Sequence, residues 1–367
     1  MRGVLQVPRL DSREAAVALD MAGCPNRCRH CWLGNEPSTP VSEDALRWVV
    51  RQFRNYVRPD ESAPFFDQLT VQTWYREPDF SSSYRRFWEL ECELSDAGKA
   101  IRFELASIWR LARDEEYAKW LKEIGTKAVQ ITFFGLEENT DYFTRRPGAF
   151  RDNIIATERL LEQGIYPRWQ LFLTTSAISE LEEFVHLVHR LNLEERAVQA
   201  GGKFTLFLNT PTPNGEAFSI EHLRPSVDVL GRLPKYLLDK TIEHFGATDI
   251  NAACGKSEAE WFEELIECEE PYADLPWKLA FMITPDLGVF SNLGEMTPGW
   301  KLGNLKRDGI SKIIQRYERD SLSGLHGMFH VPVRELAQEY GRPDSRLLYT
   351  ESDVVRRWLR LWEDHAG

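Results

Sequence analysis

Cysteine is scarce in this chain of 367 residues, which contains only six. Three of the six lie between positions 24 and 31, so any pairing within that group leaves one thiol over. Small secreted domains that are held by disulfides carry an even and much denser set of cysteines. The cysteine usage therefore argues against a disulfide framework.

Long hydrophobic runs are also missing. Residues 1–8 lack the apolar stretch of a secretory signal, and Asp20 interrupts the next apolar segment. No run approaches the roughly 20 apolar residues that a membrane-spanning helix needs. We therefore expect no membrane partner.

An excess of basic charge is the third missing feature. The formal net charge is −12 at pH 7, from 57 acidic residues and 45 Lys and Arg. Nucleic-acid binding needs a positive field that faces the phosphates, so the charge balance argues against a nucleic-acid partner. The chain is long enough for one large α/β domain with an ample core and a smaller appendage.

What the sequence does contain is a compact cysteine motif. Cys24, Cys28 and Cys31 follow a C-x3-C-x2-C spacing, and Pro25 and the flanking glycines forbid a regular helix there. Deprotonated sulfur binds iron–sulfur clusters and zinc tightly, so this loop is suited to fold around a metal centre. A [4Fe-4S] cluster held by three cysteines would keep one iron open for chemistry.

Two other metal centres are compatible with the motif. A zinc site could use the three cysteines together with His30, although zinc-binding motifs usually supply a second, separate pair of ligands. A passive electron-transfer cluster would normally have a fourth cysteine nearby, and the next one is Cys92.

Strand-like apolar segments alternate six times with helical patterns over the first two-thirds of the chain. This alternation predicts a parallel sheet built from right-handed crossover units, with fewer units than the eight of a closed barrel. The cysteine motif directly follows the first predicted strand, which places it at the carboxyl end of the strands. The predicted strands are residues 15–21, 68–74, 100–106, 128–133, 168–174 and 204–208.

The cysteine motif and the segment before it resemble the signature of the radical S-adenosylmethionine (SAM) superfamily. The resemblance implies an α/β fold, a partial (β/α)6 TIM-like barrel with a smaller α+β C-terminal extension. It further implies that Cys24, Cys28 and Cys31 hold a [4Fe-4S] cluster whose open iron binds SAM. One electron from the cluster, supplied by a donor such as flavodoxin or ferredoxin, would then cleave SAM to a 5′-deoxyadenosyl radical.

Glu77 is the first SAM ligand that the resemblance implies. Members of the superfamily commonly carry Gly-Gly-Glu-Pro after the second strand, whereas this chain has Tyr75, Arg76, Glu77 and Pro78. The retained carboxylate is chemically suited to bind the SAM ammonium group through a charge-assisted hydrogen bond.

Three further polar residues match SAM-binding positions of the family. Thr132 lies on the fourth predicted strand and Gln170 on the fifth, where polar groups approach the ribose and carboxylate of SAM. Asn209 begins a turn-rich loop after the sixth strand, at a place that resembles the adenine-side loop. Ordinary structural hydrogen bonds would explain these side chains about as well.

The last third of the chain resembles the C-terminal extension called SPASM, or its shorter twitch form. Its hairpin at 279–291 carries Ser291 where a cysteine that binds an auxiliary cluster is expected. Cys92, Cys254 and Cys268 are too few and too scattered for a four-thiolate set. We therefore expect a barrel at 1–216 and a cluster-free extension at 217–367 that covers the mouth of the barrel.

These features predict a cytoplasmic enzyme that abstracts hydrogen from its substrate after reductive cleavage of SAM. A sugar-like or antibiotic-precursor small molecule is the favoured substrate, and a peptide, as in the peptide-modifying maturases, is the alternative. Without an auxiliary cluster to accept an electron, we expect a redox-neutral rearrangement, elimination or epimerisation. Cys254 is a candidate hydrogen donor for epimerisation. A zinc-stabilised binding module remains the alternative from another class of protein.

Overall fold

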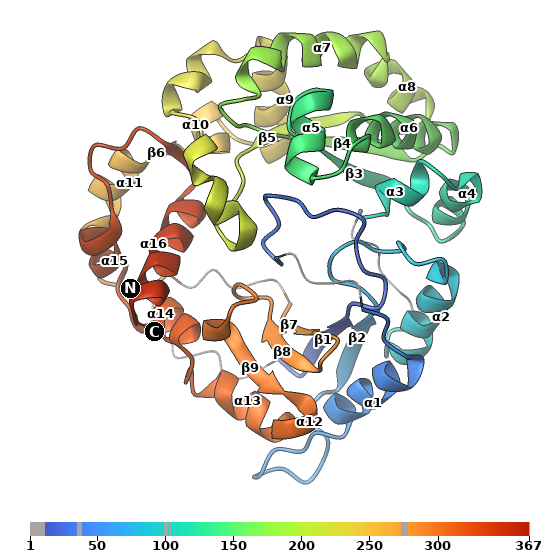
Figure 1. Ribbon diagram of the computed structural model, residues 1–367, viewed down its shortest axis with the longest axis vertical. Coiled ribbons are helices and arrows are strands. Elements are labelled where there is room, and N and C mark those ends of the chain that lie inside the picture. Colours follow the sequence, from blue (N-terminus) through green and yellow to red (C-terminus); the bar gives the residue numbers. More distant parts are fainter. Residues whose placement is uncertain (1–11, 35–38, 99–101, 103, 273–277, 367) are drawn as a thin grey trace.

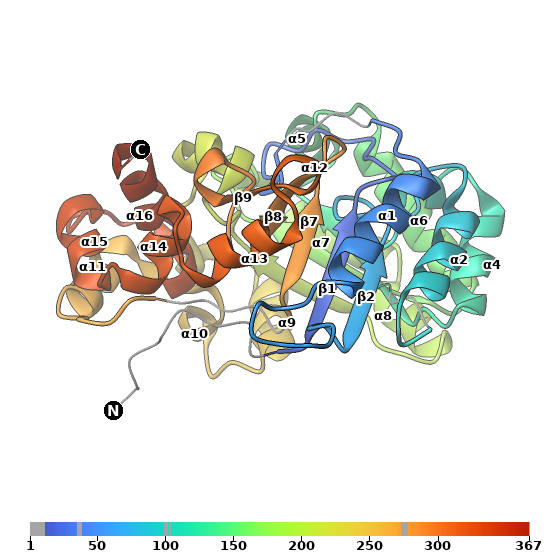
Figure 2. The same ribbon diagram turned by 90° about the horizontal axis from the view of Figure 1, so that it is seen from below.

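The computed structural model describes residues 12–34, 39–98, 102, 104–272 and 278–366. Strands and helices surround a central loop that follows β1 (Figure 1). Seen from the side, the last helices of the chain lie at one end of the molecule, whereas other parts of the extension lie beside the first barrel strands (Figure 2). No helix among these residues is long and apolar enough to cross a membrane.

The strands form two main sheets. The first has the order β2-β1-β7-β8-β9, in which β1 runs parallel to both β2 and β7. The second has the order β3-β4-β5 and is parallel throughout. The strands of the two sheets are β1 (Glu14–Leu19), β2 (Gln68–Gln72), β7 (Ala280–Ile283), β8 (Gly288–Ser291), β9 (Lys301–Asn304), β3 (Ala128–Phe133), β4 (Tyr166–Phe172) and β5 (Thr205–Asn209).

This arrangement confirms the α/β class, the parallel barrel strands and the predicted C-terminal hairpin, which is formed by β7 and β8. The prediction of a strand at 100–106 is wrong for the part of that segment that is described. Glu104 has a φ of +61°, which an extended strand cannot accommodate, although its carbonyl accepts a hydrogen bond from the Gln130 amide. Positions 100, 101 and 103 lie outside the described residues.

Helices follow the barrel strands and bury one face each. In α1, the Ser42 hydroxyl caps the first turn by accepting from the Ala45 amide, while Leu46, Val49 and Phe53 face the core. The helices of this half are α1 (Glu43–Arg54), α2 (Tyr84–Leu94), α3 (Ile108–Leu111), α4 (Glu115–Glu123), α5 (Glu137–Thr144), α6 (Ala149–Glu162), α7 (Leu181–Arg190) and α8 (Leu193–Gln199).

The C-terminal part is mainly helical. A short antiparallel pair of strands, β6 (Lys256–Ser257) and β10 (Leu348–Tyr349), connects two segments of this part that are far apart in the sequence. Its helices are α9 (Lys235–Phe245), α10 (Ile250–Cys254), α11 (Glu258–Leu265), α12 (Leu305–Asp308), α13 (Ile310–Glu318), α14 (Ser323–His330), α15 (Val333–Tyr340) and α16 (Glu351–Ala366).

The hydrophobic core follows the two sheets rather than the order of the chain. One cluster surrounds β3–β5 and includes Leu237 of α9. The hydroxyl of Thr241, also on α9, accepts a hydrogen bond from the Leu208 backbone amide of β5. A second cluster joins β1, β2 and α1 to β7–β9 and α13. Each cluster therefore takes residues from both sides of position 216, so the C-terminal part completes the packing of the barrel.

A buried arginine also ties the two parts together. The Arg224 guanidinium donates to the Thr210 hydroxyl at 2.8 Å and to the Leu348 carbonyl at 2.6 Å, and it pairs with Asp353 of α16 at 3.4 Å. Because all of these groups are buried, loss of the arginine would leave an uncompensated carboxylate and unsatisfied acceptors. This contact holds α16 against the loop that follows β5.

Candidate active site

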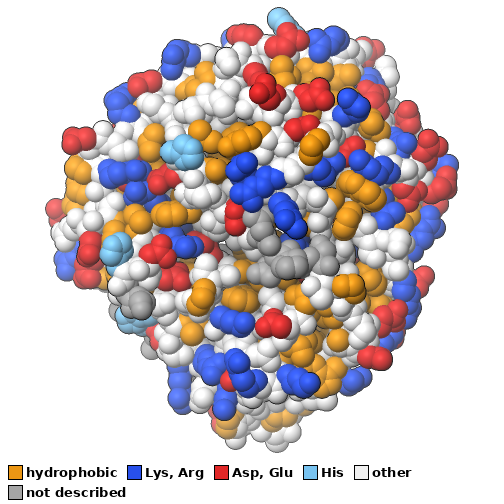
Figure 3. Space-filling view, viewed as in Figure 1, with side chains coloured by type: hydrophobic (Ala, Val, Ile, Leu, Met, Phe, Trp, Pro, Cys, Tyr) orange, Lys and Arg blue, Asp and Glu red, His pale blue; other side chains and the backbone are white. Residues whose placement is uncertain are grey.

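A cavity of about 670 Å³ lies at the carboxyl ends of the barrel strands. We call it the cysteine cavity, because Cys24, Cys28 and Cys31 line it together with Glu77. Its volume is within the range of small-molecule and cofactor sites. Basic side chains gather near the middle of the corresponding face (Figure 3). The residues that also line it include Asn26, Arg27, Arg76, Gln130, Thr132, Arg146, Asn153 and Gln170.

The cysteine loop is fixed by backbone contacts on both sides. The Gly23 amide donates to Asp20 at 3.0 Å, where β1 ends. The amides of Arg27 and Arg29 donate to carbonyl groups of α5, at 3.3 and 2.8 Å. Since these bonds connect the loop to two different elements, the positions of the three thiols do not depend on the loop alone.

The spacing of the three sulfurs discriminates between the metal centres that the sequence allows. Among the described residues, one group of three His, Cys, Asp or Glu has its ligand atoms all within 4.8 Å of one another, and it contains no cysteine. In a tetrahedral zinc site the sulfurs lie roughly 3.8 Å apart, because each Zn–S bond is about 2.3 Å. A cluster, in which each thiolate binds a different iron, requires wider spacing. The three sulfurs, which are not all within 4.8 Å of one another, are therefore not arranged as the ligands of one tetrahedral zinc ion.

Burial controls the protonation of the thiols. It raises the pKa of Cys28 to about 12 and moves the pKa of Cys24 well above its usual range, with the Glu77 charge adding to the latter shift. The Arg146 guanidinium acts in the opposite direction on Cys28. Without a cation the thiols stay protonated at neutral pH, so binding of a metal centre would release protons.

His30, which precedes the third cysteine, is not placed as a metal ligand. Its ring packs against both Phe134 and Phe172, with centroid distances of 4.7 and 5.0 Å. Burial lowers its pKa to about 4, so the imidazole is neutral. It lines the cysteine cavity as part of an aromatic wall.

Glu77 lies beside the first cysteine. One carboxylate oxygen is 3.6 Å from the Cys24 sulfur, and the other accepts a hydrogen bond from the Ser107 hydroxyl at 2.5 Å. Burial raises the pKa of Glu77 to about 7, against the effects of Ser107 and Arg146. The carboxylate is thus held at the wall of the cysteine cavity, and its contact with the SAM ammonium group stays a prediction.

Arg76, which directly precedes Glu77, has a structural role. The Arg76 guanidinium forms a buried ion pair with Asp20, which also accepts the Gly23 amide. A single carboxylate therefore connects the loop that carries Glu77 to the loop that carries the cysteines. In the sequence Asp20 only interrupts an apolar segment. Its contacts in the structure show that it links the two loops.

A second buried network anchors the other side of the Glu77 loop. Asp79 has a φ of +61° and receives two hydrogen bonds from Arg102, both at 3.0 Å. The Tyr117 hydroxyl also donates to Asp79 at 2.8 Å, and Arg102 reaches Glu91 at 2.6 Å. One guanidinium thus compensates two buried carboxylates, and one of them, Asp79, stands two residues after Glu77.

We expect Arg102→Met to destabilise the protein strongly. The substitution leaves Asp79 and Glu91 buried without their cation, which costs about 3–5 kcal/mol for a buried pair. The measurement is denaturant unfolding of the mutant and of Arg86→Met, a control that removes an exposed ion pair with Glu43. A loss of unfolding free energy no larger than that of the control would show that the network does not stabilise the Glu77 loop.

Thr132 and Gln170 lie side by side on β3 and β4. The Gln170 side-chain oxygen accepts from the Gln130 side-chain amide at 2.7 Å and from the Thr132 hydroxyl at 3.4 Å. All three side chains line the cysteine cavity. The structure therefore brings the two predicted residues together and adds Gln130, which the alternation along β3 places on the same face as Thr132.

Asn209 and Cys254 are not among the residues that line the cysteine cavity. The Asn209 side chain accepts the Thr210 amide at 2.8 Å, as a turn residue does. Cys254 ends α10 in the hydrophobic cluster around β3–β5, and burial raises its pKa to about 12. Their predicted roles in SAM binding and hydrogen donation stay predictions.

The loop after β5 touches the cysteine loop directly. The Glu216 amide donates to the Cys31 carbonyl at 3.0 Å, and Gly215 has a φ of +55°. A Cβ at Gly215 would lie 2.6 Å from the Cys31 carbonyl oxygen and 2.5 Å from that of Trp32. Only glycine permits this approach, which holds the end of the cysteine loop against the second sheet.

A second cavity of about 400 Å³ adjoins the first, and we call it the outer cavity. His30, Trp32 and Phe172 line both. The outer cavity is also lined by residues of the C-terminal part, namely Asn292, Gly294, Ser352 and Arg356. It therefore lies where the barrel meets the extension.

Comparison with known structures places the chain among proteins of one fold. The structure of anSMEcpe with bound AdoMet and Kp18Cys peptide matches with a TM-score of 0.50 and 12% identity, over 96% of this chain and 97% of that chain. The structure of anSMEcpe with bound AdoMet and Cp18Cys peptide matches with a TM-score of 0.50 and 13% identity, over the same shares. No family model and no curated protein sequence matches the chain. The shared fold is the partial α/β barrel with an extension that the resemblance to the radical SAM superfamily implies.

Proposed function

We propose that this protein is a radical SAM enzyme. The observation that carries the proposal is the gathering of three thiols and a buried carboxylate around one cavity at the carboxyl ends of parallel strands. Active sites of barrels built from parallel strands lie at that end. The fold shared with anSMEcpe, solved with bound AdoMet, supports the same conclusion.

Cys24, Cys28 and Cys31 would hold a [4Fe-4S] cluster, and the cavity beside them would take SAM. When bound, these groups supply reductive cleavage of SAM and abstraction of a hydrogen atom from the substrate. The protein holds the cysteine loop through hydrogen bonds to the Asp20 side chain and to carbonyl groups of α5, and it places Arg76 and Arg146 at the cavity wall. These cations offset the negative charge that three thiolates bring into a buried site.

Glu77 would orient SAM through its ammonium group. Ser107 fixes one carboxylate oxygen and leaves the other beside Cys24. Thr132 and Gln170, on the opposite sheet, offer hydroxyl and amide groups to the ribose and carboxylate of SAM. Asn209 does not line the cysteine cavity. It would therefore affect SAM binding indirectly, through the loop after β5, which contacts Cys31.

In this proposal residues 1–216 form the barrel and residues 217–367 form the extension. The substrate would bind in the outer cavity, which residues of both parts line. The anSMEcpe structures contain peptides, so the comparison favours a peptide over the small molecule that the sequence suggests. The outer cavity offers neutral polar groups and Arg356 to such a substrate. Incubation with candidate peptides and small molecules, followed by assay of 5′-deoxyadenosine, distinguishes the two classes.

We further propose that the chain carries one cluster and performs redox-neutral chemistry in a reducing cytoplasm, with flavodoxin or ferredoxin as electron donor. Ser291, at the position of an expected auxiliary ligand, is buried on β8. Cys92, Cys254 and Cys268 lie on α2, at the end of α10 and after α11. We therefore assign no auxiliary cluster to these three thiols in the proposal.

Anaerobically purified protein is expected to contain about four iron and four sulfide per chain, because three thiolates support one cubane. Electron paramagnetic resonance of the reduced protein should show one cluster signal. The product mass should equal the substrate mass or reflect a simple elimination. A second cluster signal, or a product lighter by two hydrogens, would contradict the redox-neutral reaction.

The same purification tests the zinc-stabilised binding module. Colourless protein with one zinc at the cysteine motif and no iron would favour that alternative. The sulfur spacing described above argues against it.

A further inference from the structure

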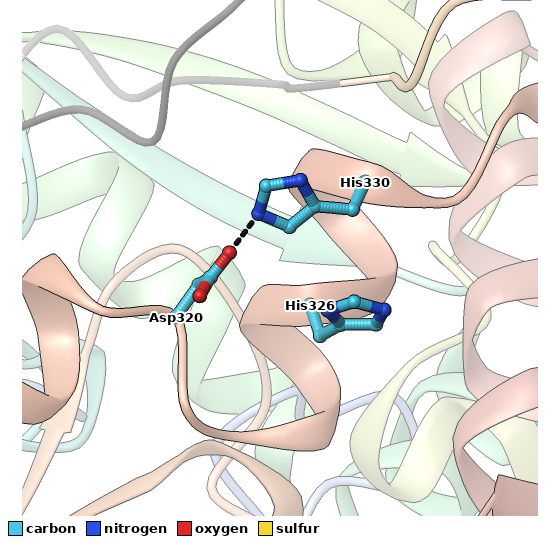
Figure 4. A group of neighbouring side chains, drawn as sticks. All are labelled: Asp320, His326 and His330. Carbon is cyan, nitrogen blue, oxygen red and sulfur yellow. Dashed lines mark hydrogen bonds and ion pairs between the residues drawn. The ribbon is translucent and has the colours of Figure 1, made fainter.

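A separate group of metal-binding side chains lies on the C-terminal part. Asp320, His326 and His330 each place a ligand atom within 4.8 Å of the others. His330 Nε2 is hydrogen-bonded to the Asp320 carboxylate, and the two point toward each other in Figure 4. None of the three lines the cysteine cavity or the outer cavity.

The local backbone explains why the two histidines share a face. They stand four residues apart on α14, which spans Ser323–His330, so their side chains lie one above the other on consecutive turns. The ring centroids are 5.1 Å apart. Spacing of i and i+4 on a helix is a recurrent way to present two imidazoles to one metal ion.

The carboxylate comes from the turn between α13 and α14. Asp320 has a φ of +44°, a conformation that aspartate tolerates better than most residues. The Asp320 and Ser321 amides donate to the Tyr317 and Arg316 carbonyls at 3.3 and 3.4 Å, which continues the end of α13. The turn therefore returns toward α14 and brings Asp320 to the histidine face.

The helix that carries the histidines is well supported. On its other face Leu325, Met328 and Phe329 are at most 2% exposed. The His326 ring stacks on Trp362 of α16, with centroids 6.1 Å apart. Because the helix and one ring are already held by packing, binding a metal would cost little additional ordering.

We propose that Asp320, His326 and His330 bind a divalent transition-metal ion, with Zn²⁺ as the fitting example. Two imidazoles and one carboxylate form a borderline donor set that suits zinc and its first-row neighbours rather than calcium or magnesium. Water would complete the coordination, since both histidines are exposed. The hydrogen bond between His330 and Asp320 already brings these two ligands together.

Such an ion would cross-link two segments of the extension. It would link the turn that follows α13, through Asp320, to α14, through the two histidines. The helix α14 in turn packs against α16 and against η4 (Pro298–Trp300). Binding to the folded state alone raises the apparent stability of a protein. This metal site is independent of the proposed cluster and of SAM cleavage.

The test uses the full, untagged protein, purified anaerobically with its iron content measured. After equilibrium dialysis against Zn²⁺, the His326→Ala/His330→Ala variant should contain one zinc equivalent less than the wild type at equal iron content. Asp320→Asn, which keeps the shape of the side chain, should weaken zinc binding at least about tenfold, because even second-shell partners of a metal contribute that much. Zn²⁺ should raise the melting temperature of the wild type but not of the double variant.

The matched control is His186→Ala/His189→Ala. These two exposed histidines lie on α7 three residues apart and belong to no group of three ligands within 4.8 Å among the described residues. The control should keep the zinc equivalent and the thermal shift. Equal zinc content in the wild type and the α14 double variant, or unchanged zinc affinity in Asp320→Asn, would overturn the proposal.

Discussion

Replacement of Cys24, Cys28 or Cys31 by alanine is expected to abolish both iron loading and SAM cleavage. Each thiolate is one of only three protein ligands in the proposed cluster site, and no other cysteine lines the cysteine cavity. With two ligands the cluster would lose the coordination that keeps three of its irons bound. The measurements are iron and sulfide content per chain and anaerobic formation of 5′-deoxyadenosine.

Cys92→Ala is the matched control for these variants. Cys92 is a partly buried cysteine on α2, and it does not line the cysteine cavity. Its substitution should leave iron content and SAM cleavage unchanged. A Cys28→Ala protein with full iron and full cleavage activity would remove the central claim of the proposed function.

Glu77→Gln is expected to weaken SAM binding by about 1.5–3 kcal/mol, the free energy of a hydrogen bond to a charged group. This corresponds to a rise in Kd of roughly 10- to 150-fold. The substitution keeps the size of the side chain and its contact with Ser107, so the packing around the loop is retained. Equilibrium binding of SAM to cluster-loaded protein gives the measurement.

Two observations accompany this prediction. Cluster content should barely change in Glu77→Gln, because the carboxylate is not a cluster ligand. Glu137→Gln, on an exposed part of α5, should bind SAM as the wild type does. Unaltered SAM affinity in Glu77→Gln would assign the carboxylate a structural role in its loop.

Most of the barrel could be predicted from local patterns. β3 at Ala128–Phe133 coincides with the predicted strand, since it alternates and ends in turn residues. β4 begins at Tyr166, two residues earlier than predicted, because its register is set by pairing with β3. The segment at 100–106 reads as a strand from its apolar residues, but the positive φ of Glu104 and its tertiary contacts exclude one in the described part.

The sequence by itself determined the three closely spaced thiols, the retained Glu77 and the alternation of strands and helices. These features depend on residues near one another in the chain, where spacing and periodicity are sufficient. Only the tertiary structure decided how Asp20 joins Arg76, how Arg102 holds Asp79, and how β7 pairs with β1. Such contacts connect distant positions, and their ion pairs persist because folding buries both partners together. No local pattern encodes which buried charge will find which partner.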